Sequence, residues 1–265
     1  MNKIQSFNKF LKPLNTVLIR NVSVNVESNF EEEYRKNHIE TNLFQKALLS
    51  VGAAAASITD PTRADMIACL GETTGEKAAK YILGKMESSE EGSQILSDQP
   101  RINSKTIDLD YLSKLPSNTL GRHYVNFLKI NNVTPDSRDP VRFMDDPQLA
   151  YVIQRYREVH DLFHTVLQMR TNMLGEVTVK WVEAIQTKLP MCIAGAIFGP
   201  VRLKQKHRAI YLNQYLPWAI ETGQKSNFLL NIYYEKRWEQ PIDEFYEEIN
   251  VSPLTLVFDR VNVDK

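Results

Sequence analysis

Residues 146–164, "DPQLAYVIQRYREVHDLFH", decide the expected fold. Asp146 is a typical N-cap residue and Pro147 suits the first helical position, so the stretch predicts a helix that begins there. Successive residues of a helix are about 100° apart around its axis. At this spacing one stripe of the helix would carry Leu149, Val152, Ile153, Tyr156, His160, Phe163 and Leu167. We therefore predict a central helix whose stripe faces the core and includes a histidine.

Helical periodicity extends over most of the remaining chain. Further helices are predicted at about 41–60, 62–71, 73–86, 88–97, 118–130, 173–188, 202–222 and 227–248, the first with Thr41 as N-cap and the last interrupted by Pro241. No strong period-two alternation and no internal repeat is present. The predicted fold is all-α: a single-domain multi-helix bundle over residues 40–250, followed by a C-terminal tail, 251–265.

Length, charge and cysteine content narrow the classes of function. A chain of 265 residues can bury a substantial core. Its 32 basic and 32 acidic residues cancel, which argues against a nucleic-acid binder. Cys69 and Cys192 lie far apart without a CxxC spacing, as is typical of a reducing compartment.

Residues 1–30 have the composition of a mitochondrial targeting segment. Four basic residues, Lys3, Lys9, Lys12 and Arg20, precede the first acid at Glu27. A basic tail is the alternative. No apolar run reaches the roughly 18 residues that a spanning helix needs. The longest candidate, "LPMCIAGAIFGPV" (189–201), is open to three interpretations: core packing, a buried hairpin, or a segment that dips into a membrane face.

A histidine pair marks the candidate site, in "YREVHDLFHTVLQMRTNMLGE" (156–176). On a helical wheel His164 lies about 40° and Asp161 about 100° from His160, so the three side chains can converge on one ion. Because the arc begins on the apolar stripe, these polar groups need partners, and a divalent cation would supply one. A histidine bound to a backbone carbonyl and an exposed HDxxH remain alternatives.

Glu176 can join this group only if the helix breaks. On one continuous helix it would lie roughly 18 Å beyond His164. Thr171, Asn172 and Gly175 favour a break, and a helical hairpin would return Glu176 toward the histidines.

The helix expected after the break raises a difficulty for Glu176. There Glu176 shares a face with Lys180 and Glu183, opposite an apolar stripe of Leu174, Val177, Trp181 and Ile185. Either this polar face lines a cavity, or Glu176 is a solvated acid.

Several common catalytic motifs are missing from the sequence. Aspartate stands where HExxH proteases have their general base, and GxSxG, a P-loop and a dinucleotide fingerprint are absent. "LGETTG" (70–75) follows a helix and is better explained as a helix C-cap than as a phosphate loop.

HDxxH followed by eleven residues and a glutamate resembles the metal-site motif of the mitochondrial coenzyme Q (ubiquinone) biosynthesis protein 4 family. The resemblance spans about residues 40–248 and departs at none of the four motif positions. Other stretches similar to the family are "FQKALLSVGAAAASITDPTRADMIACLGETTG", "LAYVIQRYREVHD", "TNMLGE", "LPMCIAGAIFGPVRL" and "NIYYEKRWEQ".

The resemblance implies an all-helical protein, peripheral on the matrix side of the mitochondrial inner membrane, that helps to organise a complex with other enzymes of coenzyme Q synthesis. It implies a lyase (decarboxylase) that removes the C1 carboxylate of 4-hydroxy-3-methoxy-5-polyprenylbenzoate. Its metal ligands and catalytic residues would be His160, Asp161, His164 and Glu176, with Zn²⁺ or another divalent cation. The alternatives are a non-catalytic scaffold that binds prenyl lipid around a structural metal, and a metal phosphohydrolase; a homo-oligomer is left open.

A polyprenyl tail would need an apolar groove. The small-residue segments 52–56 and 194–199 could leave room for one, or could allow tight helix packing.

Overall fold

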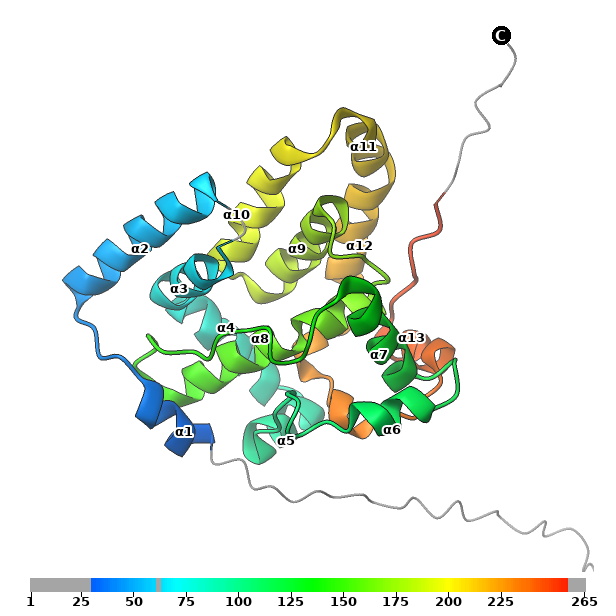
Figure 1. Ribbon diagram of the computed structural model, residues 1–265, viewed down its shortest axis with the longest axis horizontal. Helices are drawn as coiled ribbons and strands as arrows, with labels where there is room; N and C mark the ends of the chain where they lie inside the picture. The colour runs from blue at the N-terminus through cyan, green and yellow to red at the C-terminus, as the bar shows by residue number, and fades with distance from the viewer. Residues whose placement is uncertain (1–29, 61–62, 257–265) are drawn as a thin grey trace, which may run out of the picture.

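The computed structural model describes residues 30–60 and 63–256, and within them every regular element is helical (Figure 1). The α-helices are α1 (Phe30–Asn37), α2 (Leu43–Thr59), α3 (Ala64–Thr74), α4 (Glu76–Glu87), α5 (Glu90–Asp98), α6 (Leu109–Lys114), α7 (Leu120–Asn131), α8 (Pro147–Val166), α9 (Met173–Thr187), α10 (Pro190–Phe198), α11 (Gln205–Ile210), α12 (Leu216–Lys225) and α13 (Ile242–Ile249). The prediction of an all-α single domain is confirmed. The predicted targeting segment lies outside the described residues, except for Phe30.

Helix α8 crosses the middle of the molecule and packs against α1, α4, α7 and α9 (Figure 1). It begins as predicted: Pro147 occupies the first turn, and the Asp146 carboxylate accepts hydrogen bonds from the backbone N–H groups of Gln148 and Leu149. Residues 149–166 are all buried, so α8 is enclosed on every side rather than along one stripe.

Charged residues on α8 are buried in ion pairs. The pairs are Arg155–Glu235, Arg157–Glu72 and Glu158–Arg101. Each brings a partner from another part of the chain, so no charge on this part of α8 is buried alone. Sequence periodicity missed this burial because a charged face ordinarily indicates solvent.

The turn between α8 and α9 makes the predicted hairpin. The backbone N–H of Met169 donates to the His164 carbonyl at 2.9 Å, and Gln168 adopts a left-handed φ of 52°. Asn172 then caps α9 by accepting from the N–H of Gly175 at 2.9 Å. A Cβ on Gly175 would lie 1.9 Å from the Arg170 carbonyl oxygen, so only glycine fits this close approach. The helix break predicted before Glu176 is confirmed.

Three segments differ from their prediction. Asn42 rather than Thr41 caps α2, through a capping box with Gln45, and α1 lies ahead of the expected domain start. The predicted helix 227–248 is wrong over its first half, where two short 3₁₀ turns precede α13. Backbone N–H groups there donate to side chains of distant helices, at Leu229 to Gln186 and at Tyr233 to Glu91, which takes them out of a helical ladder.

The stretch "LGETTG" contains a helix C-cap, as predicted, because Gly75 is the C-cap of α3. Helix α3 therefore ends later than the expected end at Gly71. The segment 189–201 is not a hairpin. It forms α10 and a 3₁₀ turn, Gly199–Arg202, and buries Cys192 and Ala196. Core packing therefore accounts for one face only.

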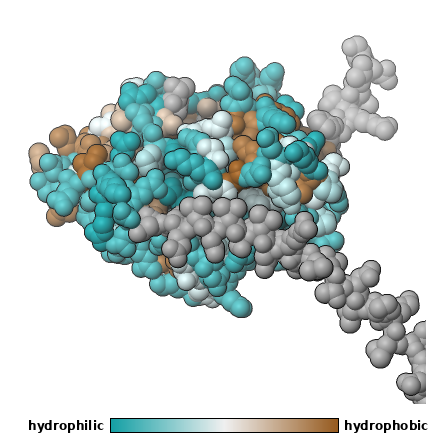
Figure 2. All heavy atoms as spheres, turned by 60° about the horizontal axis from the view of Figure 1, so that its bottom comes forward, coloured by the Kyte–Doolittle hydropathy of each residue, from teal (hydrophilic) through white to brown (hydrophobic). Residues whose placement is uncertain are grey.

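An exposed apolar surface, which we call the apolar rim, covers one face each of α2 and of α10 with its 3₁₀ turn. It consists of Leu43, Phe44, Leu48, Val51, Ile58, Ile193, Ile197, Phe198 and Val201. Arg202 donates to the Ile58 carbonyl at 2.6 Å and so joins the two parts. Apolar side chains gather at the left end of the molecule, where α2 lies (Figures 1 and 2). Among the described helices, none has the length and apolarity to cross a bilayer.

The two small-residue segments have different surroundings, and this predicts opposite effects of alanine. A Cβ on Gly199 would lie 2.6 Å from Cγ1 of Val177, whereas a Cβ on Gly52 would meet nothing within 4 Å. Gly199→Ala should lower the free energy of unfolding by about 1–3 kcal/mol through overpacking. Gly52→Ala should raise it by about 0.5–1 kcal/mol because it restricts the unfolded chain. Chemical denaturation measures both, and equal effects would contradict the packing described.

Candidate metal centre

Helices α8 and α9 bring three of the predicted site residues together. One ligand atom each from His160, His164 and Glu176 lies within 4.8 Å of the others. Nε2 of His160 is 4.0 Å from Oε2 of Glu176, and Nε2 of His164 is 3.5 Å from its Oε1. The two imidazole rings are nearly perpendicular, at 80°. The hairpin thus makes the convergence that sequence spacing required.

Glu183 sets the orientation of His160. Nδ1 of His160 lies 2.6 Å from Oε1 of Glu183, and because a carboxylate only accepts, this nitrogen carries the proton. Burial lowers the pKa of His160, which favours the neutral ring. The lone pair on Nε2 is therefore available on the side of Glu176.

His164 is oriented in the same way by the backbone. Its Nδ1 donates to the Met169 carbonyl at 3.1 Å, within the hairpin turn. Its Nε2 is buried and has no hydrogen-bond partner among the described residues. Two imidazole lone pairs and a carboxylate thus face one point with no donor between them. A divalent cation fits this donor set, since metal-bound histidines commonly donate their second nitrogen in this way.

Glu176 completes the group from the first turn of α9. Burial raises the pKa of its carboxyl group, but positive charge on His164, His160 and Lys180 lowers it more, to about 2; a cation held by the two neutral imidazoles would act in the same direction. Glu176 is therefore ionised at neutral pH. Its side chain remains 33% exposed, so this is the open side of the group.

The polar face of α9 lines the site, which resolves the difficulty over Glu176. Glu183, on this face, is completely buried. The opposite stripe packs elsewhere: Val177 and Trp181 lie against Leu203 and Tyr211. Glu176 is consequently part of an interior polar cluster and is not a freely solvated acid.

Asp161, the fourth predicted ligand, lies outside this group of three. Its Oδ1 accepts a hydrogen bond of 3.1 Å from Nη2 of Arg138. Arg138 belongs to the segment between α7 and α8, a proline-containing loop in which periodicity singles out no residue. Only the folded structure reveals that this arginine reaches α8.

A second polar cluster surrounds Glu183, the partner of Nδ1 of His160. Glu183 accepts from Lys180 at 2.5 Å, and the Cys192 thiol lies 3.6 Å from the same carboxylate. Tyr156 contacts both Lys180, at 3.2 Å, and Cys192, at 3.1 Å.

These contacts determine the charges in the cluster. Burial raises the pKa of Glu183 and lowers that of Lys180, but their mutual attraction outweighs burial in both, so both are charged. Burial raises the pKa of Cys192 to about 12, so its thiol is neutral. The spacing of Glu176, Lys180 and Glu183 on one helical face was the sequence signal for this cluster.

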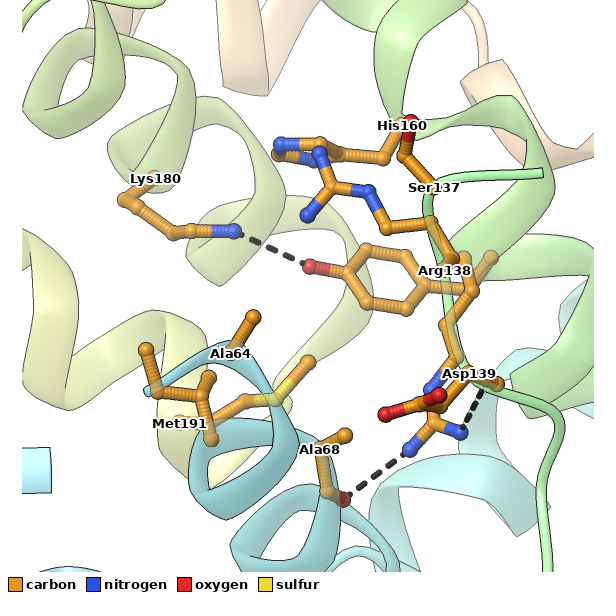
Figure 3. Close-up of a pocket in the computed structure, with 11 residues that line it drawn as sticks. Ala64, Ala68, Ser137, Arg138, Asp139, His160, Lys180 and Met191 are labelled. Atoms are coloured by element: carbon orange, nitrogen blue, oxygen red, sulfur yellow. Dashed lines mark hydrogen bonds between the residues drawn. The ribbon is translucent and has the colours of Figure 1, made fainter. Parts of the chain in front are cut away.

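A pocket opens beside His160, between α3, the Arg138 loop, α8, α9 and α10. Figure 3 shows Arg138 and His160 reaching into it from the right and Lys180 from the left, with Ala64, Ala68 and Met191 below them. Its cavity volume is about 80 Å³, and the non-atom space there, counted out into open solvent, is about 520 Å³. A planar apolar group could lie on the apolar side of the pocket while a polar substituent faces the polar side.

Known proteins share this fold. A crystal structure of a protein from Nostoc punctiforme, described as a candidate ubiquinone biosynthesis protein, superposes with a TM-score of 0.62 over 78% of this chain and 97% of that one. The two are 19% identical, so the likeness concerns the fold alone.

Sequence relatives are much closer. The protein named ubiquinone biosynthesis protein COQ4 homolog, mitochondrial, from Bombyx mori is 61% identical over 88% of this chain and 90% of its own length. The protein of the same name from Drosophila melanogaster is 56% identical over 85% of this chain and 84% of its own length. The family described as coenzyme Q (ubiquinone) biosynthesis protein Coq4 matches residues 34–255. With relatives this similar over most of its length, the chain belongs to the Coq4 family of ubiquinone biosynthesis proteins.

Proposed function

We propose that this protein is a carboxy-lyase that removes the C1 carboxylate of a polyprenylated 4-hydroxybenzoate, 4-hydroxy-3-methoxy-5-polyprenylbenzoate. The ligands of its divalent cation, for which we favour Zn²⁺, would be His160, His164 and Glu176. The observation that carries the proposal is the buried Nε2 of His164. This atom faces the carboxylate of Glu176, and no hydrogen-bond donor of the described residues lies between the two acceptors. Family membership supplies the pathway, ubiquinone biosynthesis.

The reaction needs one proton and releases CO₂. A proton adds to ring carbon C1, and the 4-hydroxyl oxygen stabilises the resulting dienone-like ring. The bond between C1 and the carboxyl carbon then breaks, and its electron pair restores the aromatic ring. A divalent cation at the three ligands would orient the carboxylate or stabilise negative charge on oxygen.

The chain's own residues prepare this site. Glu183 keeps the proton of His160 on Nδ1 and away from the ligand group. Asp161, in this proposal, holds Arg138 at the pocket through the hydrogen bond to Nη2. Ala64, Ala68 and Met191 provide the apolar wall for the aromatic ring. Excluding water from such a wall strengthens the polar interactions opposite it.

We place the protein peripherally on the matrix side of the mitochondrial inner membrane, and the apolar rim supports contact with a membrane. The α10 part of the rim belongs to the helix that carries Met191, whose side chain lines the pocket, and in this proposal a polyprenyl tail leaving the pocket continues into lipid. The relatives named above are designated mitochondrial. Contacts with other enzymes of the synthesis complex belong to the same proposal.

A pair of charge substitutions on the rim tests membrane contact. Phe198 and Val201 are 69% and 72% exposed. Each would contribute about 1.5–3 kcal/mol when buried in lipid, so Phe198→Glu with Val201→Glu should weaken binding to phosphatidylcholine and cardiolipin vesicles by more than about tenfold. Ile130→Glu, at a position 71% exposed on α7, is the control and should bind normally. Unchanged binding of the double variant in flotation would refute this orientation.

Conversion of a defined substrate tests the chemistry. Purified protein loaded with Zn²⁺ should convert short-chain 4-hydroxy-3-methoxy-5-prenylbenzoate to the decarboxylated phenol, and chelation should stop it. The 4-methoxy ether should not react, because its oxygen cannot become the carbonyl of a dienone. Metal binding without any conversion would favour the non-catalytic scaffold instead. Hydrolysis of a prenyl phosphate without decarboxylation would favour a phosphohydrolase.

A further inference from the structure

Arg138 is a half-buried cation at the pocket with unused hydrogen-bonding capacity. Its guanidinium donates to Asp161 through Nη2, while its Nε–H is buried and has no partner among the described residues. A guanidinium carries five N–H donors in a planar fork that matches a carboxylate. The side chain is 34% exposed, and that part lines the pocket. An anionic ligand in the pocket would accept hydrogen bonds from the part of the guanidinium that faces it.

Lys180 places a second cation at the same pocket. Its ammonium group bonds to Glu183 at 2.5 Å and to Tyr156 at 3.2 Å, and its side chain is 21% exposed. Burial lowers the pKa of Lys180, but Glu183 raises it more, so it keeps its charge. Figure 3 shows Lys180 approaching the pocket from the side opposite Arg138, which lies beside His160.

The balance of charge around the pocket favours one class of anion. Around the pocket and the ligand group, the cations Arg138 and Lys180 face three carboxylates, those of Asp161, Glu176 and Glu183. The sum is one negative charge, and a divalent cation changes it to one positive charge. A monocarboxylate would neutralise this, whereas a phosphomonoester, with about −1.5 to −2, would leave an excess of negative charge.

Other charged groups nearby do not alter this balance. Arg157 also lines the pocket, but it is paired with Glu72 at 2.6 Å. Asp139 also lines the pocket, but it is exposed, so solvent screens its charge.

We propose that Arg138, assisted by Lys180, is the residue by which this pocket selects an aromatic monocarboxylate. Arg138 binds the carboxylate through its free N–H donors, Asp161 holds its guanidinium in place, and the ring lies against Ala68 and Met191. This inference rests on the proposed function and names a specificity residue that the metal motif does not contain.

Binding of three ligands that do not lose CO₂ tests it. The probes are short-chain 4-methoxy-3-prenylbenzoate, its benzamide, and a prenyl monophosphate, titrated calorimetrically into the full-length protein loaded with Zn²⁺. The native protein should bind the benzoate at least about tenfold more tightly than the benzamide and more tightly than the phosphate. Tighter binding of the phosphate would overturn the proposal.

Arg138→Gln isolates the role of the guanidinium. It should weaken benzoate binding by about tenfold or more and leave benzamide binding and Zn²⁺ affinity unchanged. Arg138→Lys keeps the charge without the fork and should retain part of the preference. Arg63→Gln, at a position on the surface where the arginine pairs with Asp65, is the matched control and should behave as the native protein does. Lys180 is unsuitable as the test residue because it also pairs with Glu183.

The outcomes separate this inference from the proposed function. If Arg138→Gln weakens the binding of benzoate and of benzamide equally, or weakens the binding of neither, the selection of a carboxylate by Arg138 is refuted. If the preference is present but the 4-hydroxy compound releases no CO₂, the decarboxylase proposal fails while carboxylate selection stands.

Discussion

His164→Ala should abolish decarboxylation and lower the affinity for Zn²⁺ by more than about 100-fold, because the variant removes a ligand rather than one of the supporting groups that typically change affinity about 10–100-fold. The imidazole is buried, and its Nε2 has no hydrogen-bond partner among the described residues. Competition with a chromophoric chelator measures the affinity. The same sample gives the rate of phenol formation.

The structural cost of this variant can be separated from its effect on metal. His164 lies in the core beside Phe127, so alanine leaves a cavity. His164→Gln fills more of that space and should show the same loss of activity with a smaller loss of stability. His123→Ala, at a histidine on α7 outside the ligand group, serves as the control. Normal turnover by either His164 variant would refute the catalytic role of the metal group.

Glu183→Gln should lower both the stability of the fold and the affinity for Zn²⁺. Glutamine leaves the charge of Lys180 buried without its partner, which costs about 3–5 kcal/mol in comparable pairs. Loss of the carboxylate on Nδ1 of His160 should reduce metal affinity by about 10–100-fold. Denaturation of the metal-free protein and chelator competition measure the two effects independently.

Glu235→Gln is the matched control for Glu183→Gln. It breaks the buried pair with Arg155, on a part of α8 that does not contribute to the metal group. It should cost a similar free energy of unfolding, about 3–5 kcal/mol, without changing Zn²⁺ affinity. If both variants weakened metal binding equally, the effect of Glu183 would be a general consequence of instability and not of orienting His160.

Local signals in the sequence predicted the elements that carry the site. Asp146 and Pro147 located the start of α8, and Asn172 with Gly175 predicted the break before α9. These signals are short-range, because caps and close backbone approaches involve residues three to five positions apart. The helical wheel also predicted that His160 and His164 are buried, and both are, although α8 is buried on every side.

Long-range pairing was not predictable in the same way. Glu183 and Lys180 were recognised as a polar face, yet their burial depends on α9 packing against α8. Arg138 reaches Asp161 from 23 positions earlier, out of a loop without periodicity. The mistaken helix at 227–248 has the same origin, since side chains such as Glu91 bind backbone groups from far away in the sequence. Each of these is a tertiary contact that a single helical pattern does not encode.

The most direct test of the central claim is the release of labelled CO₂. Short-chain 4-hydroxy-3-methoxy-5-prenylbenzoate, labelled in its carboxyl carbon, is incubated with protein loaded with Zn²⁺, with chelated protein, and with His164→Ala. We predict that only the first sample releases labelled CO₂, in an amount equal to the phenol formed. Release from all three samples at the same rate, or from none of them, would contradict the account.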